Sequence, residues 1–399
     1  MKPELLFLTQ RIPYPPTKGE KIRTCNVLRH LAGRYAVRVG CLMDDPADRA
    51  HVADLARLCR DVHVAPLDPR MARLRCVGGL LDGRPLSLPY FADAGLDRWV
   101  ARTLAEARPA VTFVCSSAMA QYVMHRRPQL GRFVMDFVDV DPEKWRAYAE
   151  GARPPMRWVY AREGRRLLDY DRRVAAAADA SVFVSEAEAA LFRTLAPESA
   201  RRTHAVSNGV DAGHFAPGTA WPAPFEAGRP AFVFTGTMDY HPNVDAVTWF
   251  ARSILPRVQA ALPGARFFVV GASPAPEVQV LGALPGVTVT GRVPDVRPYL
   301  AHATAAVAPL RIARGIQNKV LEAMAMGRPV VVSPEALEGI EAAPGRDVLL
   351  ATGEEGLARA CVDAAGPAGP AIGAAGRRCV VEHYAWPARL AALDALLPA

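Results

Sequence analysis

The sequence of 399 residues has no apolar run that approaches the ~20 residues needed to cross a bilayer, because arginine, aspartate or proline interrupts every candidate. The first residues also lack the basic flank, the length and the small-residue cleavage site of a secretory signal peptide. We therefore expect a cytoplasmic protein that does not span a membrane, in which the apolar run Leu5–Leu8 starts a first β-strand.

Paired cysteines are missing as well. The seven cysteines are scattered, with no Cys-x-x-Cys pair and no histidine nearby at metal-ligand spacing. We expect reduced core cysteines, no bound metal and no cofactor. No Gly-x-Gly-x-x-Gly follows an early strand, which disfavours a dehydrogenase with tandem dinucleotide-binding domains. The formal net charge of +8 suits nucleic acid, an anionic membrane surface or a phosphorylated substrate, but it suits generic solubility equally well. We expect no nucleic-acid partner.

Strand-like and helix-like segments alternate along the chain. Half of the residues are apolar (51%), enough for two cores of roughly 150–200 residues each. Short apolar runs predict strands at Leu5–Thr9, Val37–Met43, Val62–Ala65, Val111–Cys115, Phe133–Phe137 and Ser181–Val184, and again at Ala231–Thr235, Arg266–Val270, Val287–Thr290, Ala305–Ala308, Val330–Val332 and Val348–Leu350. This alternation predicts two doubly wound α/β domains with parallel sheets.

A turn-rich stretch separates the two sets of strands. It runs from 208 to 230 and contains Pro217, Pro222, Pro224 and several glycines, with little periodicity. We place the two domains at 1–212 and 213–384, and expect a helix over 385–397 to pack back on the first domain. Open α/β sheets bind ligands beyond the carboxyl ends of their strands. We therefore expect the active site in a cleft between the domains.

The most informative segment spans residues 309–331. It predicts a strand end, a glycine loop, a helix and a Gly-x-Pro turn into the next strand. The unpaired N–H groups and partial positive charge of a helix N-terminus suit a diphosphate, and Gly315 permits close backbone approach. Lys319 and Glu322 lie three residues apart on one helix face, where the lysine would meet a diphosphate and the carboxylate would accept two ribose hydroxyls. The competing interpretation is an ordinary helix whose Lys319 and Glu322 face solvent.

This segment resembles the donor-site signature of glycosyltransferase family 4, a large group of retaining GT-B enzymes. Glu322 matches the second of the family's two glutamates. Arg314 occupies the position of the first, which contacts the donor sugar in the family, and Gly315-Ile316-Gln317 replaces the family's Gly-Phe-Gly. The resemblance implies a GT-B fold, catalysis without metal, and a donor site that includes Arg314, Gly315, Ile316, Gln317, Asn318, Lys319 and Glu322.

Other segments of the second half extend the resemblance. Asn208-Gly209-Val210-Asp211 is similar to the family's interdomain segment, for which we expect a structural role. The loop after the strand Ala231–Thr235 is similar to the family's Gly-x-Met-x-x-x-Pro-Asn loop beside the donor phosphates. The resemblance implies donor contacts from Gly236, Thr237, His241, Asn243, Arg292 and Val293. The alternatives are a turn residue for His241 and a solvent-facing side chain for Arg292.

In the first domain, Gly19 stands where the family has its acceptor-side glycine loop. Lys18 and Arg23 would then meet an acceptor phosphate, although a capped and solvated helix start accounts for them equally well. Asp139 follows a predicted strand, and it is our candidate for a carboxylate that activates the acceptor or positions the sugar. Ser117, in the stretch Val114–Tyr122, is a further candidate for acceptor binding.

Together these segments resemble the subgroup of family 4 associated with exosortase/PEP-CTERM exopolysaccharide systems. The resemblance implies a retaining hexosyltransferase that moves a sugar from a nucleotide-sugar to a glycan acceptor carried on a lipid. The arginine-rich segment 153–173 would dock on an anionic inner leaflet, or would form a solvated helix on the first sheet. The rival functions are a nucleotide-sugar epimerase of GT-B-like fold and an inactive GT-B subunit that binds nucleotide as a scaffold.

Overall fold

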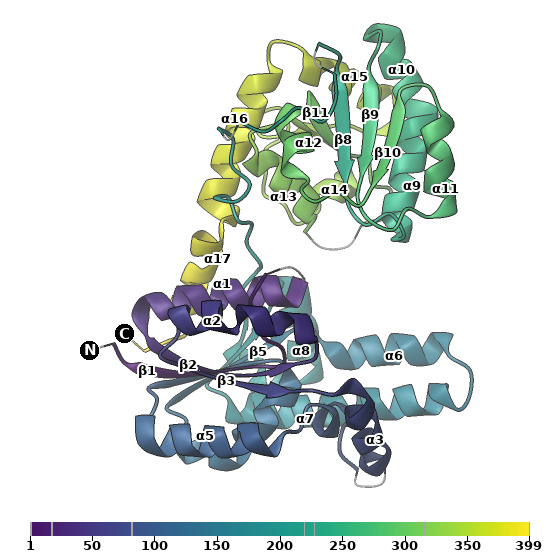
Figure 1. Cartoon of the computed structure of the whole chain (residues 1–399). Helices are drawn as coiled ribbons and strands as arrows, with labels where there is room; N and C mark the ends of the chain where they lie inside the picture. Colours follow the sequence, from purple (N-terminus) through teal and green to yellow (C-terminus); the bar gives the residue numbers. More distant parts are fainter. Residues whose placement is uncertain are drawn as a thin grey trace. The chain divides into compact units, whose positions relative to one another are not determined.

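The computed structural model describes residues 2–16, 19–80, 83–218, 220–226, 228–313 and 316–398. The chain forms two compact units (Figure 1). Unit 1 comprises Met1–Asn208 and Arg389–Ala399, and unit 2 comprises Gly209–Ala388. Unit 1 thus ends at Asn208 rather than at 212, and the chain returns to it at Arg389 rather than at 385.

Within its described residues, unit 1 contains a parallel sheet of seven strands in the order β3-β2-β1-β4-β5-β6-β7. The strands are β1 (Glu4–Thr9), β2 (Ala36–Met43), β3 (Asp61–Pro66), β4 (Val111–Cys115), β5 (Arg132–Val138), β6 (Ala180–Phe183) and β7 (Thr203–Ala205). β1 lies between β2 and β4, and Leu5–Leu8 is fully buried. A strand covered on both faces is an uninterrupted apolar run, which is why the sequence predicts β1. It does not predict β7, whose Thr-His-Ala sequence contains no such run.

Helices cover the sheet of unit 1 on both faces. They are α1 (Gly19–Arg34), η1 (Pro46–His51), α2 (Val52–Leu58), α3 (Pro69–Gly79), α4 (Ser87–Tyr90), α5 (Ala94–Ala107), η2 (Ser117–Tyr122), η3 (Met124–Gln129), α6 (Asp141–Gly151), α7 (Met156–Ala177), α8 (Glu186–Leu195) and η4 (Pro197–Arg202). α6 and α7 pack against each other as a hairpin, in which the ring centroids of Trp145 and Tyr160 lie 5.5 Å apart (Figure 1).

Unit 2 repeats this architecture with a parallel sheet of six described strands in the order β10-β9-β8-β11-β12-β13. The strands are β8 (Ala231–Thr235), β9 (Arg266–Val270), β10 (Val287–Gly291), β11 (Ala305–Ala308), β12 (Val330–Val332) and β13 (Leu349–Leu350). The helices are α9 (His241–Trp249), η5 (Phe250–Ile254), α10 (Leu255–Ala261), α11 (Pro276–Gln279), η6 (Val280–Ala283), α12 (Arg297–His302), α13 (Asn318–Ala325), α14 (Pro334–Leu337), α15 (Gly353–Ala365), α16 (Gly369–Cys379) and η7 (Val380–Tyr384). The predicted pair of parallel α/β domains is confirmed.

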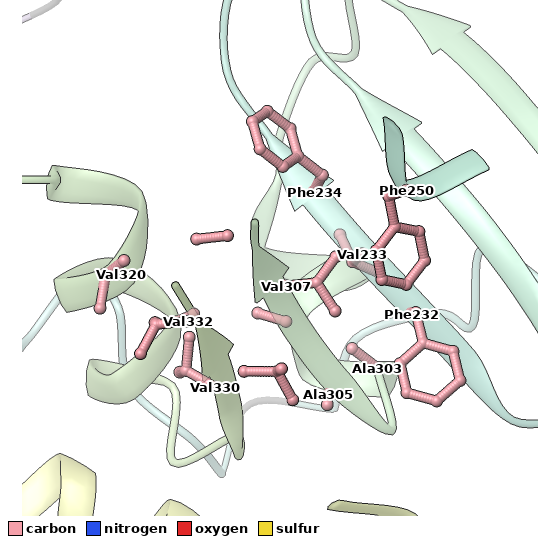
Figure 2. Packing of buried hydrophobic residues seen from close by; sticks show 14 of the residues in the cluster. Phe232, Val233, Phe234, Phe250, Ala303, Ala305, Val307, Val320, Val330 and Val332 are labelled. Atoms are coloured by element: carbon pink, nitrogen blue, oxygen red, sulfur yellow. The ribbon is translucent and has the colours of Figure 1, made fainter. Parts of the chain in front are cut away.

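The core of unit 2 fixes the position of α13. Figure 2 shows Val307 of β11, Val330 and Val332 of β12, and Val320 of α13 among the buried side chains of one cluster. Val320 is 0% exposed. Because α13 packs on β11 and β12 and follows β11 in the chain, its first turn lies at the carboxyl edge of this sheet.

The turn-rich stretch after Asn208 is anchored to unit 2. The Val210 amide donates to the Tyr384 carbonyl at 2.8 Å, and Val210 pairs with Ala385 in a parallel bridge. A Cβ on Gly209 would lie 2.6 Å from the Cα of Trp386, so glycine is required for this approach. Arg377 donates to the Phe215 carbonyl at 3.1 Å. The segment that the sequence indicates only as a linker therefore begins as an ordered part of unit 2.

The last helix, α17 (Trp386–Asp394), ends in unit 1. The Asp394 carboxylate bonds to His30 Nε2 at 2.9 Å and accepts from Arg34 Nη1 at 2.8 Å, both on α1. The Tyr35 hydroxyl donates to the Pro398 carbonyl at 3.1 Å. No described helix combines the length and the apolar character needed to cross a membrane.

Candidate functional site

Lys319 lies in the first turn of α13, at the carboxyl edge of the unit 2 sheet. Its ammonium donates to Asn243 Oδ1 at 2.5 Å and lies 4.5 Å from the centre of the Phe234 ring. Phe234 is on β8 and Asn243 is on α9, so the contacts join three elements far apart in sequence. A cation over an aromatic face is attracted by the ring quadrupole. The side chain is therefore held in one place rather than extended into solvent.

Asn243 ties Lys319 to the loop that follows β8. The Asn243 side chain is 3% exposed, and its Nδ2 donates to the Thr237 carbonyl at 2.8 Å. A Cβ on Gly236 would lie 2.7 Å from this Nδ2, so the close approach requires glycine. Of the residues predicted to bind the donor, the structure thus brings Gly236, Thr237, Asn243 and Lys319 together.

The pKa values of Lys319 and Glu322 are both shifted toward neutral pH. Burial lowers the pKa of Lys319 to about 8, with Glu322 opposing the shift. Burial raises the pKa of Glu322 to about 7, with Lys319 opposing the shift. Both groups therefore titrate close to neutral pH. Half-buried titratable groups with shifted pKa values at the edge of a parallel sheet are typical of functional sites.

Three glycines stand at the carboxyl ends of neighbouring strands in unit 2. Gly236 follows β8, Gly271 follows β9 and Gly291 ends β10. The Gly271 amide donates to the Gly291 carbonyl at 3.2 Å, and a Cβ on Gly271 would lie 1.6 Å from the Gly236 oxygen. The backbones are therefore in direct contact, and Gly271 has no room for a side chain. Gly271 was not among the predicted site residues, although a glycine directly after the apolar strand Arg266–Val270 was a usable signal.

The other described residues that we predicted to bind the donor differ in their exposure to solvent. Arg292 is exposed after β10, and His241 is exposed at the first position of α9. Asn318 is exposed at the start of α13, whereas Val293 and Ile316 are half-buried against the core. Gln317 is half-buried and precedes α13 with an extended backbone (φ −87°, ψ 98°). Within the described part of the chain, no hydrogen bond or ion pair joins His241, Arg292 or Val293 to Lys319. Arg314 and Gly315 lie outside the described residues.

In unit 1, the predicted contact of Arg23 with an acceptor phosphate is wrong. Arg23 is 1% exposed, and its guanidinium pairs with both oxygens of the buried Asp136 at 2.9 and 3.1 Å. The same group donates to the Val206 carbonyl and to Asn208 Oδ1, each at 2.9 Å. These donors are already occupied by partners in the interior, because this face of α1 packs on the sheet. Lys18 lies outside the described residues, and Gly19 begins α1.

The prediction that Ser117 binds the acceptor is wrong as well. Ser117 is 6% exposed, and its hydroxyl donates to the carboxyl group of Asp171. Burial raises the pKa of Asp171 well above its usual range. Asp139 differs, since its side chain is 33% exposed and accepts from Lys144 Nζ at 2.7 Å. It remains the acceptor-side candidate.

Polar side chains also lie at the carboxyl ends of β1, β2 and β4. They were not among the predicted site residues. The Ser116 hydroxyl donates to Gln10 Oε1 at 2.7 Å, and Gln10 Nε2 donates to Glu20 at 3.1 Å. Arg11 Nε donates to Asp44 at 2.8 Å. The signal was present, because Gln10, Asp44 and Ser116 each directly follow a predicted strand. Carboxyl ends of parallel strands are the edge at which such sheets bind ligands.

Two strained residues flank this edge. Ser116 has φ 72° and Val138 has φ 73°, a region that non-glycine residues seldom occupy, least of all β-branched ones. Asp136 holds both, because its carbonyl accepts from the Ser116 amide at 2.9 Å and its carboxylate accepts from the Val138 amide at 3.2 Å. Strain of this kind clusters at functional sites. In the described part of the chain, no group of three or more histidine, cysteine or acidic side chains is arranged to hold a metal ion.

Comparison with known proteins agrees with this geometry. Residues 229–365 match the model of the family described as Glycosyl transferases group 1, and no curated protein matches the chain. Sucrose-phosphate synthase from Thermosynechococcus elongatus is similar in structure, with a TM-score of 0.63 at 16% identity over 99% of this chain and 98% of that one. Anabaena HepE in complex with UDP and glucose gives 0.61 at 15% identity over 98% of each chain.

A glycosyltransferase from Rickettsia africae gives a TM-score of 0.64 at 13% identity, over 99% of this chain and 98% of that one. At such identities the likeness establishes the fold. The two parallel-sheet units have the GT-B fold, and residues 229–365, which include Lys319 and Glu322, match the family described as Glycosyl transferases group 1.

Proposed function

We propose that this protein transfers a sugar from a nucleotide-sugar donor to a glycan acceptor. The observation that carries the proposal is the Lys319 ammonium, held by Asn243 and Phe234 at the start of α13 within the group 1 domain. Negative charge develops on the leaving diphosphate as the bond to the sugar breaks. A fixed cation beside a helix N-terminus stabilises that charge.

The donor is a nucleoside diphosphate sugar, and uridine is the first base to test. HepE, which shares the fold, has been solved with UDP and with UDP-glucose. In this chain Glu322 would accept the ribose hydroxyls, and the loop of Gly236 after β8 would lie beside the phosphates, as the resemblance to family 4 implies. Arg314, in place of the glutamate of family 4, would help to neutralise the diphosphate.

The transfer retains the anomeric configuration by front-side displacement, as the resemblance to family 4 implies. An acceptor hydroxyl forms a bond to the anomeric carbon on the side from which the diphosphate leaves. The bond between that carbon and the phosphate oxygen breaks, its electron pair stays on the diphosphate, and the hydroxyl proton passes to the departing oxygen. Asp139 is proposed to position the acceptor, since it is half-exposed after β5.

The acceptor is proposed to be a lipid-linked glycan in exopolysaccharide assembly, at the cytoplasmic face of the membrane. Support comes from the resemblance to the family 4 members of exosortase/PEP-CTERM systems. The basic hairpin of α6 and α7 adds to it, since it exposes Arg153 and Arg157 beside Trp158, which is 68% exposed.

A melting screen of the full chain against UDP-, GDP- and dTDP-sugars tests this proposal, with and without a lipid-diphosphate acceptor. We expect one donor to raise the melting temperature and its nucleoside diphosphate to be released only when acceptor is present. NMR of the product should show the anomeric configuration of the donor. A sugar that changes without acceptor would identify an epimerase instead, and binding without any turnover would identify a nucleotide-binding scaffold.

A further inference from the structure

Helix α3 turns its large apolar side chains away from the protein. Its buried positions hold the small residues Ala72, which is 0% exposed, and Gly79. A Cβ on Gly79 would lie 2.9 Å from a proline side chain, so this side of the helix packs closely. In contrast, Met71, Leu74 and Val77 are 55%, 63% and 62% exposed. A surface helix of a globular protein normally has the reverse orientation, with its large apolar residues toward the core.

The start of α7 extends this exposed surface. Trp158 is 68% exposed and Met156 is 43% exposed. Arg162, one helical turn after Trp158, donates to the carbonyls of Gly79 at 2.9 Å and Leu80 at 3.2 Å at the end of α3. Residues four apart share a helix face, so Trp158 lies on the side of α7 that meets α3.

Exposure of this degree is confined to a few residues. Among the large apolar side chains that the structure describes, those more than 60% exposed are Leu74, Val77 and Trp158. All three lie on this part of unit 1. We call the surface formed by residues 70–80 of α3 and its end, together with 153–158 at the start of α7, the α3 surface.

Positive charge surrounds the apolar residues of the α3 surface. Residues 68–80 contain three arginines and one acidic residue, Asp68, whose carboxylate accepts from the Arg70 amide at the start of α3. Arg70 and Arg73 are exposed on α3, and Arg153 and Arg157 are exposed at the start of α7. The nearby Glu163 does not offset them at the surface, because it is 1% exposed and its carboxylate accepts from backbone amides in the interior.

We propose that the α3 surface docks on an anionic membrane leaflet, with α3 lying in the plane of the interface. Its apolar side chains would enter the boundary between headgroups and acyl chains, and its arginines would reach the lipid phosphates. α3 has 11 residues, a length of about 16 Å, so it cannot span the apolar layer of about 30 Å. This inference develops the membrane contact included in the proposed function, but it does not depend on sugar transfer.

Co-sedimentation of the full chain with lipid vesicles tests the proposal. We expect binding to vesicles of phosphatidylglycerol and phosphatidylcholine, weak binding to phosphatidylcholine alone, and a decrease as salt is added. The double variant Leu74→Ser/Val77→Ser should reduce the partition coefficient about tenfold or more. Arg70→Glu/Arg73→Glu should abolish the preference for phosphatidylglycerol. All four positions are exposed, so folding should be preserved.

Matched control variants lie in unit 2. Val280 and Val381 are 56% and 46% exposed, and Arg252 and Arg359 are exposed arginines. Val280→Ser/Val381→Ser and Arg252→Glu/Arg359→Glu should bind vesicles as the unmodified protein does. These controls replace exposed apolar and arginine side chains of the same kinds, but in unit 2.

The proposal is overturned if the unmodified protein does not bind phosphatidylglycerol vesicles at low salt, or if the Leu74→Ser/Val77→Ser variant binds them as well as the unmodified protein does. It is also overturned if the protein sediments as a dimer that this variant dissociates without any vesicle binding, since the α3 surface would then join two copies of the chain. Release of nucleoside diphosphate with a water-soluble acceptor should be unchanged in the variant. If that release is absent in every protein while vesicle binding follows the expected pattern, the proposed transfer fails and the docking surface stands.

Discussion

Replacing Asn243 with alanine should weaken the binding of UDP and change its dependence on pH. Asn243 accepts from the Lys319 ammonium at 2.5 Å and donates to the Thr237 carbonyl at 2.8 Å. Alanine removes both hydrogen bonds and leaves the Lys319 ammonium with the Phe234 ring and the charge of Glu322. A hydrogen bond to a charged group is worth about 1.5–3 kcal/mol, and about 1.4 kcal/mol is a tenfold change in affinity. The dissociation constant for UDP should therefore rise about tenfold or more.

The pH profile gives the sharper test. A diphosphate needs the charged form of Lys319, whose pKa is about 8 in the free protein. The contribution of Lys319 to the affinity is therefore full below this pH and falls as the pH rises through it. Because a hydrogen bond to the charged form favours that form, Asn243→Ala should lower the pKa further and move this alkaline limb downward by about one pH unit. Asn243→Asp places a carboxylate beside the ammonium and should move the same limb upward, while repelling the diphosphate.

Isothermal titration of UDP into each protein, from about pH 6 to about pH 9, would measure both effects. The matched control is Asn26→Ala, which removes one side-chain hydrogen bond, to the Ile22 carbonyl on α1. It should leave the affinity and the profile unchanged. Opposite shifts of the alkaline limb in the two Asn243 variants are the expected result. If both variants keep the profile of the unmodified protein, Lys319 does not contact the diphosphate and the reasoning is refuted.

Three further predictions address the site and the two cores. In the unmodified protein, UDP affinity should fall as the pH drops through the Glu322 pKa of about 7. Glu322→Gln should remove this pH dependence and weaken UDP binding at pH 8 about tenfold. The same calorimetric titrations would measure both effects. Gly271→Ala places a Cβ 1.6 Å from a backbone oxygen and should destabilise the protein by about 3 kcal/mol or more. Gly282→Ala places a Cβ 4.0 Å from the Val289 side chain and should change the stability by no more than about 0.5 kcal/mol. Thermal melts would compare the two variants. Arg23→Ala leaves the buried carboxylate of Asp136 without its ion-pair partner and should lower the free energy of unfolding, measured in urea, by about 3–5 kcal/mol. A loss below about 1 kcal/mol would contradict the structural role given to this pair.

The sequence predicts the sheets well because strands buried on both faces are continuous apolar runs. Val111–Cys115, Ala231–Thr235 and Arg266–Val270 have the predicted bounds. β7 shows the limit, since a three-residue edge strand has too few side chains to form a pattern. Its place is set by pairing with β6, which is information that lies outside the strand itself.

Polar side chains are harder to predict, since their role depends on partners distant in sequence. Nothing local in the chain indicates that Arg23 meets Asp136, which is 113 residues away. A buried arginine and a solvent-facing one have the same sequence neighbourhood. Asn243 shows the same difficulty, because the spacing predicts its loop but not the bond to Lys319, 76 residues on. Likewise, Met71, Leu74 and Val77 recur every three residues in α3, and only the structure reveals that they face outward.

The return of the chain to unit 1 at Arg389 has a consequence for how the protein is made. Unit 2 is one continuous stretch, Gly209–Ala388, whereas unit 1 is assembled from two stretches that enclose it. During synthesis the first 208 residues leave the ribosome long before Asp394. The hydrogen bonds of His30 and Arg34 to Asp394 therefore form only after the last residues have been made. Unit 2 can thus complete its contacts first, although it is synthesised second. A protease that cuts near residue 388 would remove part of unit 1 and leave the other unit whole.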